Sequence, residues 1–168
     1  MTMRSTLAVA AALAFAAPAG FAATTPAPAK PATTPTLTVW LYDGGAGAKM
    51  ATDRGMGMAR KGHATMGLRL SGDSFKAGEL TLKVNNTSKA TMHELVVVPL
   101  KGAKTAPTFD AAKNAIDEEA AGTAGEVSEL EPGKSGSSTL TLKAGVYMLV
   151  CNIPGHYANG MWRVITVK

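Results

Sequence analysis

Near the C-terminus, three side chains with metal-binding chemistry follow one another at a regular spacing. Cys151, His156 and Met161 are five residues apart, and they offer a thiolate, an imidazole and a thioether. His93, in an apolar stretch earlier in the chain, can supply a second imidazole. A cysteine and two histidines in a trigonal plane, with methionine as a weak axial ligand, are the set that selects copper at blue electron-transfer sites. These residue types predict one copper site.

Two predicted strands and the loop between them must position the C-terminal ligands. Strands at Val146–Cys151 and Trp162–Val167 leave a loop of ten residues, and its Pro-Gly and Asn-Gly pairs are turn formers. The loop can therefore fold back and turn all three side chains toward one point. His93 lies in a predicted strand at Thr91–Pro99, which a sandwich of two sheets can bring beside the strand that ends at Cys151.

Each of these residues also has an ordinary structural explanation. A buried cysteine is usually a small hydrophobic residue, a lone histidine is usually a hydrogen-bonded polar residue, and Met161 could fill core volume. Those explanations fit poorly together, because this thiol stands with His and Met at ligand spacing. An unpaired thiol is also unusual in an exported protein, which the first 22 residues predict this one to be, as described below. As the only cysteine, Cys151 also excludes an intrachain disulfide, a four-cysteine zinc site and a thiolate-bridged binuclear copper centre.

From Thr36 onward, short runs of alternating apolar and polar residues are separated by glycine, asparagine, aspartate and serine. A period of two is typical of half-buried strands. The pattern predicts an all-β chain with strands at Thr36–Leu41, Thr65–Ser71, Glu79–Asn86, Thr91–Pro99, Ser137–Leu142, Val146–Cys151 and Trp162–Val167. Because a single open sheet would leave one apolar face in water, we expect two antiparallel sheets packed as a β-sandwich.

One segment departs from the strand pattern. Between Phe109 and Ala121 the apolar residues are spaced for one face of a helix. Thr108 is a suitable N-cap, and Gly122 lies just beyond the end. The sequence therefore predicts one short helix inserted between the strands.

Residues 1–22 have the architecture of a secretory signal peptide. Arg4 supplies the cationic start, an apolar run follows, and small residues precede a cleavage position expected after Ala22. Residues 23–35 are rich in proline, alanine and threonine, which is typical of an extended linker. We expect a domain over residues 36–168 and export to the periplasm. The apolar run of the leader is shorter than the ~20 residues that cross a bilayer, and no other segment approaches that length, so we expect no membrane span in the mature chain.

The histidine strand and the C-terminal loop resemble those of the cupredoxin family of small blue copper proteins, which includes plastocyanin and azurin. The resemblance covers about residues 64–168. It is carried by Thr91-Met92-His93-Glu94-Leu95-Val96-Val97-Val98, by Ala144-Gly145-Val146-Tyr147-Met148-Leu149-Val150-Cys151, and by the loop with Pro154-Gly155-His156 and Met161. It implies a Greek-key β-sandwich in which His93, Cys151, His156 and Met161 bind one type 1 copper per chain. The ligand spacing is most similar to that of rusticyanin-like members.

The chain departs from the family pattern beside the first histidine. Many cupredoxins have an asparagine directly after that histidine, and its side chain hydrogen-bonds across to the cysteine loop. Glu94 occupies this position here. The residues that support the ligands from outside are therefore expected to differ from the usual set.

The resemblance also implies a function. It predicts a periplasmic electron carrier, not an enzyme, that cycles Cu(II)/Cu(I) between redox proteins such as a c-type cytochrome and an oxidase or reductase. We expect a monomer whose electrons enter through His156. The imidazole would reach the surface inside an apolar patch built from Ile153, Pro154, Tyr157 and Met161.

A second class of function is a periplasmic copper carrier or delivery protein. It would use an exchangeable, thioether-rich Cu(I) site, and the residues available for one are Met50, Met56, Met58, His63 and Met66. Methionines also fill irregular apolar surfaces, so the same residues could be structural. Colour separates the two functions, because a Cu(II)–thiolate site absorbs strongly in the visible and a Cu(I) carrier is colourless.

Other functions are poorly supported. A copper oxidase or nitrite reductase needs additional copper held by several more histidines, and His63 is the only one left. The formal net charge is +5, but no basic run is longer than Arg60-Lys61 and aromatic residues are scarce. We therefore expect no nucleic-acid partner.

Overall fold

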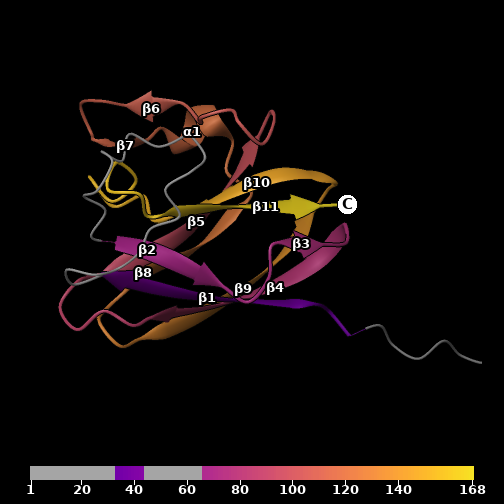
Figure 1. Cartoon of the computed structure of the whole chain (residues 1–168), viewed down its shortest axis with the longest axis horizontal. Coiled ribbons are helices and arrows are strands. Elements are labelled where there is room, and N and C mark those ends of the chain that lie inside the picture. The colour runs from indigo at the N-terminus through magenta and orange to yellow at the C-terminus, as the bar shows by residue number, and fades with distance from the viewer. Residues whose placement is uncertain (1–32, 44–65) are drawn as a thin grey trace, which may run out of the picture. The chain divides into compact units, whose positions relative to one another are not determined.

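Alternating hydrophobic residues build two sheets that pack face to face. The computed structural model describes residues 33–43 and 66–168 of the chain, which belong to one compact unit. One sheet has the order β2-β1-β4-β9 and the other β3-β11-β10-β5-β8 (Figure 1). The strands of the first sheet are β1 (Thr36–Asp43), β2 (Met66–Leu70), β4 (Gly78–Asn86) and β9 (Ser135–Leu142). Those of the second are β3 (Ser74–Phe75), β5 (His93–Leu100), β8 (Gly125–Leu130), β10 (Gly145–Val150) and β11 (Trp162–Val167).

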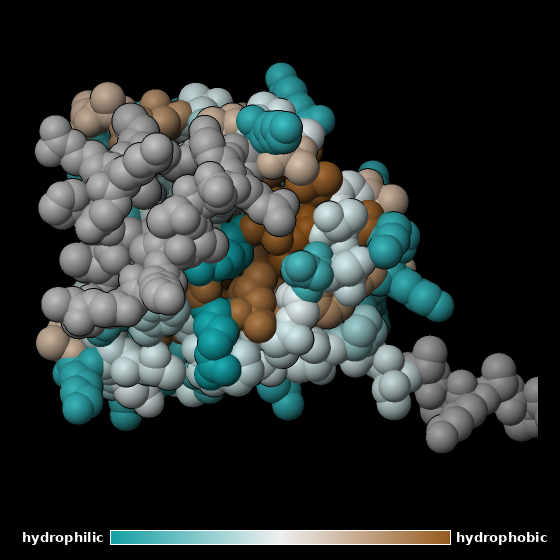
Figure 2. All heavy atoms as spheres, viewed as in Figure 1, coloured by the Kyte–Doolittle hydropathy of each residue, from teal (hydrophilic) through white to brown (hydrophobic). Residues whose placement is uncertain are grey.

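The main core lies between the sheets and follows from strand periodicity. Along β4, Leu80, Leu82 and Val84 are buried while the residues between them point outward. In the space-filling view of Figure 2, a band of hydrophobic side chains is visible in the middle of the face shown, bordered by hydrophilic ones. The predicted all-β sandwich is confirmed.

A second, smaller core covers the outer face of the five-stranded sheet. Tyr147 and Leu149 of β10 pack into the main core, whereas Met148 and Val150 pack into the second core with Ile116. Because both of its faces are covered, β10 reads as a continuous apolar run instead of an alternating one.

Two strand pairs differ from the expected antiparallel arrangement. β1 pairs with β4 in parallel, and so does β11 with β3. The other pairs are antiparallel, including β10 with its neighbours β5 and β11. The short strand β3 and the strand β8 were not predicted from the sequence.

The prediction of a helix over Phe109–Ala121 is wrong for most of its length. The segment forms the strand pair β6 (Phe109–Asp110) and β7 (Ala115–Ile116), followed by the single-turn helix α1 (Glu118–Ala121). Asp110 accepts hydrogen bonds from the backbone of Ala112 and Lys113, which favours a turn over a helix. The N-cap is Asp117 in place of Thr108, while Gly122 ends the helix in the left-handed conformation as expected.

The expected signal peptide and most of the expected linker lie outside the described residues. Within residues 33–43 and 66–168, no helix is long and apolar enough to cross a membrane.

Candidate metal centre

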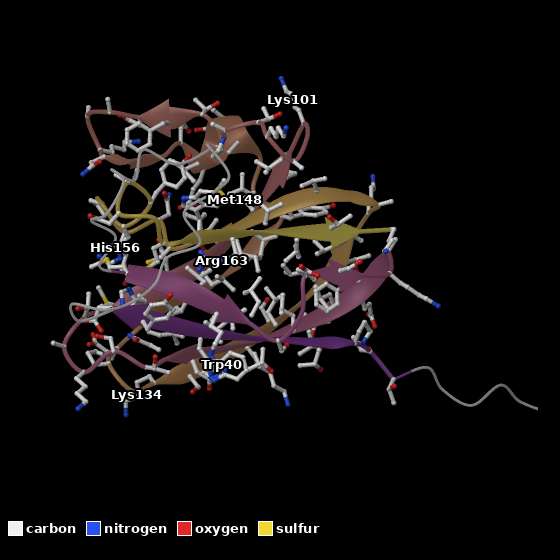
Figure 3. All side chains as sticks on the ribbon, viewed as in Figure 1. Trp40, Lys101, Lys134, Met148, His156 and Arg163 are labelled. Carbon is white, nitrogen blue, oxygen red and sulfur yellow. The ribbon has the colours of Figure 1, made fainter. Side chains whose placement is uncertain are left out.

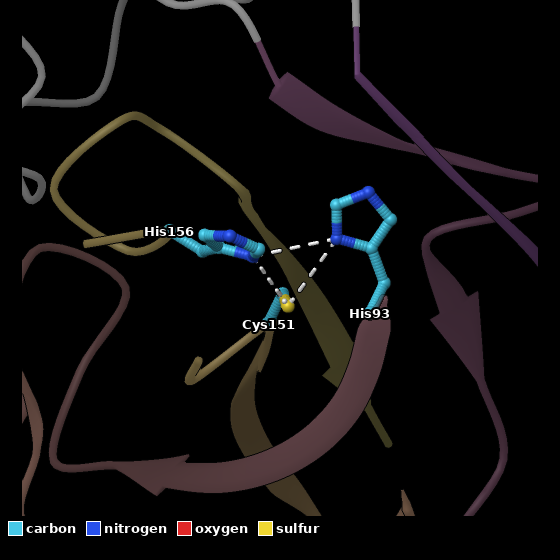
Figure 4. A group of neighbouring side chains, drawn as sticks. All are labelled: His93, Cys151 and His156. Carbon is cyan, nitrogen blue, oxygen red and sulfur yellow. Dashed lines mark hydrogen bonds between the residues drawn. The ribbon is translucent and has the colours of Figure 1, made fainter. Parts of the chain in front are cut away.

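The ligand atoms of His93, Cys151 and His156 converge at one end of the sandwich. Each pair of these atoms lies within 4.8 Å, and Figure 4 shows both imidazoles turned toward the sulfur. The Cys151 Sγ lies 3.1 Å from Nδ1 of His156 and 3.7 Å from Nδ1 of His93, and the two nitrogens are 3.3 Å apart. Among the described residues, this is the group with the composition and geometry of a metal site.

Strand pairing explains why residues 58 positions apart meet. β5 and β10 are antiparallel neighbours, and the pairing reaches Val150 opposite Val96. His93 begins β5 and Cys151 directly follows β10, so both lie at the same end of the sheet. The backbone amide of Glu94 confirms this closeness, because it donates a hydrogen bond to the Cys151 sulfur at 3.4 Å.

The β10–β11 loop brings in the third ligand and the methionine. Its backbone amide at His156 donates to the carbonyl of Ile153. The Met161 amide donates to the carbonyl of His156, and the Met161 carbonyl accepts from the Cys151 amide. Met161 is fully buried in the same core cluster as Cys151. The loop therefore folds back as the sequence predicts, with its cysteine and methionine ends joined.

The donor set fits a metal ion of the size of copper. The separations of 3.1, 3.3 and 3.7 Å place a point in the plane about 2.0 Å from all three atoms, close to the ~2.0–2.3 Å that nitrogen and sulfur ligands keep from a metal. Two imidazoles and a thiol are also an unusual group to bury without a metal.

Burial sets the charge of the metal-free site. Burial lowers the pKa of His93 to about 4 and also lowers the pKa of His156. It raises the pKa of the Cys151 thiol to about 12. All three groups are therefore neutral near pH 7 without metal, and the imidazole lone pairs are free to bind a cation.

A hydrogen-bond network behind His93 holds the turn that leads into β5. The carboxylate of Asp43, at the end of β1, accepts from the hydroxyls of Ser88 and Thr91, each at 2.8 Å. The buried side chain of Asn86 donates to the carbonyls of Thr91 and Leu130 and accepts from the Ser88 amide. This network was not predicted from the sequence, although a run of short polar residues between two apolar strands is a usual signal of such a turn.

The position after the first histidine still connects to the cysteine loop. Glu94 carries a pKa raised to about 7, mainly by burial and also by the nearby carboxylates of Glu118 and Glu126, while a hydrogen bond from the Asn152 backbone opposes the shift. Asn152 itself is buried and was also missed by the sequence analysis. Its position directly after Cys151 was the feature of the sequence from which a contact near the site could have been predicted.

The expected apolar patch around His156 is only partly present. Ile153 is half-buried and Pro154 is exposed, but Tyr157 and Met161 are buried in the two cores. His156 is 8% exposed. It lies at the end of the β-sandwich that is opposite the C-terminus (Figures 1 and 3). The prediction that Tyr157 and Met161 form surface is therefore wrong, because both pack inward.

The residues considered for a second copper site are almost all outside the described part. Met50, Met56, Met58 and His63 lie in the segment 44–65, which the structure does not describe. Met66 begins β2 and packs, half-buried, against the main core, so its described contacts are structural.

Comparison with known proteins agrees with this geometry. Residues 77–168, more than half of the chain, match the model of the sulfocyanin (SoxE) domain family. The structure is similar to that of rusticyanin from Thiobacillus ferrooxidans, at 20% sequence identity and a TM-score of 0.51, over 81% of this chain and 79% of that one. Dithionite-reduced auracyanin from Roseiflexus castenholzii matches at 23% identity and a TM-score of 0.46, over 82% of this chain and 98% of that one. No curated protein sequence matches the chain.

The match to rusticyanin supports the cupredoxin fold, which the sheet order and the ligand loop already indicated. Proteins with this fold and ligand set are blue copper proteins, which generally transfer electrons and are generally not enzymes. The cluster of two histidines and a cysteine, with Met161 buried in the same core as the cysteine, is consistent with a type 1 copper site. The chain belongs to the sulfocyanin (SoxE) domain family of cupredoxin-like copper proteins.

Proposed function

We propose that this protein is a periplasmic one-electron carrier with a single type 1 copper per chain. His93, Cys151 and His156 would hold the copper through two imidazoles and a thiolate, and Met161 would offer it a weaker thioether ligand. The observation that carries the proposal is the convergence of Nδ1, Sγ and Nδ1 in a buried cluster. When bound, the copper supplies the one-electron couple between Cu(II) and Cu(I).

The protein residues keep the ligand positions fixed while the charge changes. Cys151 is held by the Glu94 amide at its sulfur and by the Met161 carbonyl at its own amide. The network of Asp43, Ser88 and Asn86 holds the turn that leads into the strand that begins with His93. Ligands whose positions are preset need little rearrangement on gain or loss of an electron, which favours fast transfer.

The site is also shielded from water. His93, Cys151 and Met161 have no exposed surface, and His156 has the largest exposed fraction of the four, at 8%. His156 is thus the ligand through which an electron enters or leaves with the shortest path to a partner. A c-type cytochrome and an oxidase or reductase are the partner classes we propose, consistent with export by the leader at residues 1–22.

A redox titration tests the proposed activity. The copper-loaded, leader-free protein is titrated while its visible absorption is recorded, and it is then mixed with an oxidised c-type cytochrome. We expect a reversible couple of one electron per chain and rapid reduction of the cytochrome by the reduced protein. A two-electron couple, or release of copper in each cycle, would contradict the proposal and favour a copper carrier.

A further inference from the structure

The segment inserted between β5 and β8 forms a small structured unit of its own. β6 and β7 pair with each other, and Asp117 caps α1 by accepting from the Ala120 amide. Figure 1 shows β6, β7 and α1 together on one side of the five-stranded sheet, above β10 in that view. The hydrophobic side chain of Ile116 packs into the second core, beside Val150 and Tyr157. The insertion therefore packs on the five-stranded sheet at β10, the strand that leads directly into Cys151.

A single side chain of the ligand loop makes three hydrogen bonds to this insertion. Oδ1 of Asn152 accepts from the Ile116 amide at 2.6 Å, and Nδ2 donates to the Ile116 carbonyl at 3.0 Å. Nδ2 also donates to Oε1 of Glu118 at 2.7 Å. The amide of Asn152 thus pairs with both backbone groups of Ile116, as a neighbouring strand would. Asn152 is 7% exposed, so these bonds have little competition from water.

Two further contacts join the insertion to the loop, one on each side of His156. The Gly155 amide donates to the carbonyl of Asn114 at 2.8 Å. Asn114 adopts a positive φ of 52°, a conformation that asparagine tolerates better than most residues. The rings of Phe109 and Tyr157 pack with centroids 5.8 Å apart. The attached positions therefore bracket His156 directly, at residues 155 and 157, and Asn152 directly follows Cys151.

The loop alone does not supply this support. Its internal hydrogen bonds, which include those from Cys151 to Met161, from His156 to Ile153 and from Asn159 to Gly155, set its fold, but they do not hold its outer side, which faces the insertion. The contacts to Ile116, Glu118 and Asn114 come from that outer side. Partners outside the ligand shell orient metal ligands, and their loss typically weakens metal binding by about 10–100-fold.

We propose that the insertion formed by β6, β7 and α1 holds the copper-ligand loop in its binding geometry, with Asn152 as the positioning residue that connects the two. This inference rests on the proposed copper site for its effect on metal binding. The hydrogen bonds that hold the loop are present in the metal-free protein, so the effect of Asn152 on the loop can be tested without copper.

The first test uses amide hydrogen exchange of the metal-free protein. In Asn152→Ala we expect the amides of Ile116 and Gly155 to exchange at least about tenfold faster, since an amide exchanges when its hydrogen bond opens, while the amides of β1 and β4 keep their wild-type rates. Asn159→Ala is the matched control, because the Asn159 side chain donates to the Gly155 carbonyl within the same loop. Unchanged exchange at Ile116 and Gly155 in Asn152→Ala would overturn the proposal.

The second test measures the loaded site. For Asn152→Ala we expect Cu(II) affinity, measured by competition with a chelator, to fall about 10–100-fold. We also expect a wider copper hyperfine splitting and a lower reduction potential, because a relaxed loop lets Cu(II) approach the tetragonal geometry it prefers. Asn159→Ala should stay within about twofold of wild type, as expected for a surface change. If the two variants changed Cu(II) affinity and hyperfine splitting equally, the insertion would have no particular role in holding the ligand loop.

A second variant keeps the test decisive if Asn152→Ala does not fold. Glu118→Ala removes only the bond from Nδ2 of Asn152 and leaves both bonds to Ile116. We expect exchange at Ile116 and Cu(II) affinity to change in the same directions, by about two- to tenfold. Wild-type values of both in Glu118→Ala would then count against the proposal. If wild-type protein binds no copper through Cys151, the proposed function fails, and the exchange data still decide whether Asn152 fixes the loop.

Discussion

The backbone amide of Glu94 donates to the sulfur of Cys151 across two neighbouring strands, at 3.4 Å. This hydrogen bond links the residue after one imidazole ligand to the thiol that would bind the metal. A hydrogen bond to sulfur stabilises its anionic form and is part of what sets the reduction potential at a metal–thiolate site. The sheet pairing of β5 and β10 is thus directly involved in the chemistry of the site.

Met161→Leu tests the axial position. Leucine has nearly the same volume, so the fully buried position should tolerate it at a cost below about 1.5 kcal/mol in the free energy of unfolding. The strong visible band should remain, because it comes from the thiolate. The reduction potential should rise, because copper loses an electron donor. Electrochemistry and thermal unfolding measure both; an unchanged potential would show that the thioether is not a ligand.

Asn86→Ala tests the support behind His93. Its Nδ2 serves the carbonyls of Thr91 and Leu130, both at 2.8 Å, and the variant leaves these groups buried without a partner. We expect a loss of about 2–4 kcal/mol in the free energy of unfolding of the metal-free protein. Denaturant titration measures it.

The matched control for that variant is Asn85→Ala, on the same strand. Asn85 is half-buried and bonds to the Ser135 hydroxyl at an exposed position. We expect a loss of no more than about 1 kcal/mol there. Similar losses for both variants would contradict the view that Asn86 has a particular part in holding the turn before His93.

Asp43 predicts an acid dependence of stability. Although burial alone would raise its pKa, hydrogen bonds from Thr91 and Ser88 lower it below the usual value. A carboxyl whose pKa is depressed by folding stabilises the protein above its unfolded pKa of about 3.9, and this contribution is lost as the pH falls through the lower folded value.

Denaturation of the metal-free protein at a series of pH values checks this. At pH 7 we expect Asp43→Asn to be less stable than wild type by about 1–2 kcal/mol, and the difference should shrink toward zero below about pH 3. Asp73→Asn, at an exposed position, is the control and should leave the curve unchanged. A difference that is independent of pH would rule out the carboxylate as its cause.

Most strands and the convergence of His93, Cys151 and His156 could be predicted from the sequence, for a physical reason. The alternating burial in β4 and the unbroken apolar run of β10 follow directly from the order of polar and apolar residues in the sequence. Thiol, imidazole and thioether groups each occur in only one type of side chain, so candidate ligands can be recognised from the sequence. The positions of Cys151, His156 and Met161 in one loop followed from turn-forming pairs. The chain between β10 and β11 covers residues 151–161, one residue more than the predicted loop, because Cys151 lies just beyond β10 and not at its end.

What the sequence did not reveal depends on contacts between distant segments. The residues 109–121 have helical spacing, but Asp110 and the positive φ of Asn114 turn the chain into a strand pair, and packing on the second core stabilises it. Tyr157 was expected at the surface because the family resemblance implies an apolar patch around His156, whereas the insertion and β10 bury it. The role of Asn152 is likewise visible only when the insertion is placed beside the loop.

The measurement that tests the account most directly is the visible absorption and electron paramagnetic resonance spectrum after one equivalent of Cu(II) is added to the leader-free protein. For wild type and His63→Ala we predict an intense band toward the red and a narrow copper hyperfine splitting, because a thiolate donates strongly to copper in a trigonal site. For Cys151→Ala we predict loss of both. A colourless or ordinary tetragonal Cu(II) spectrum in wild type, or loss of the band in His63→Ala, would contradict the assignment of His93, Cys151 and His156 as the copper site.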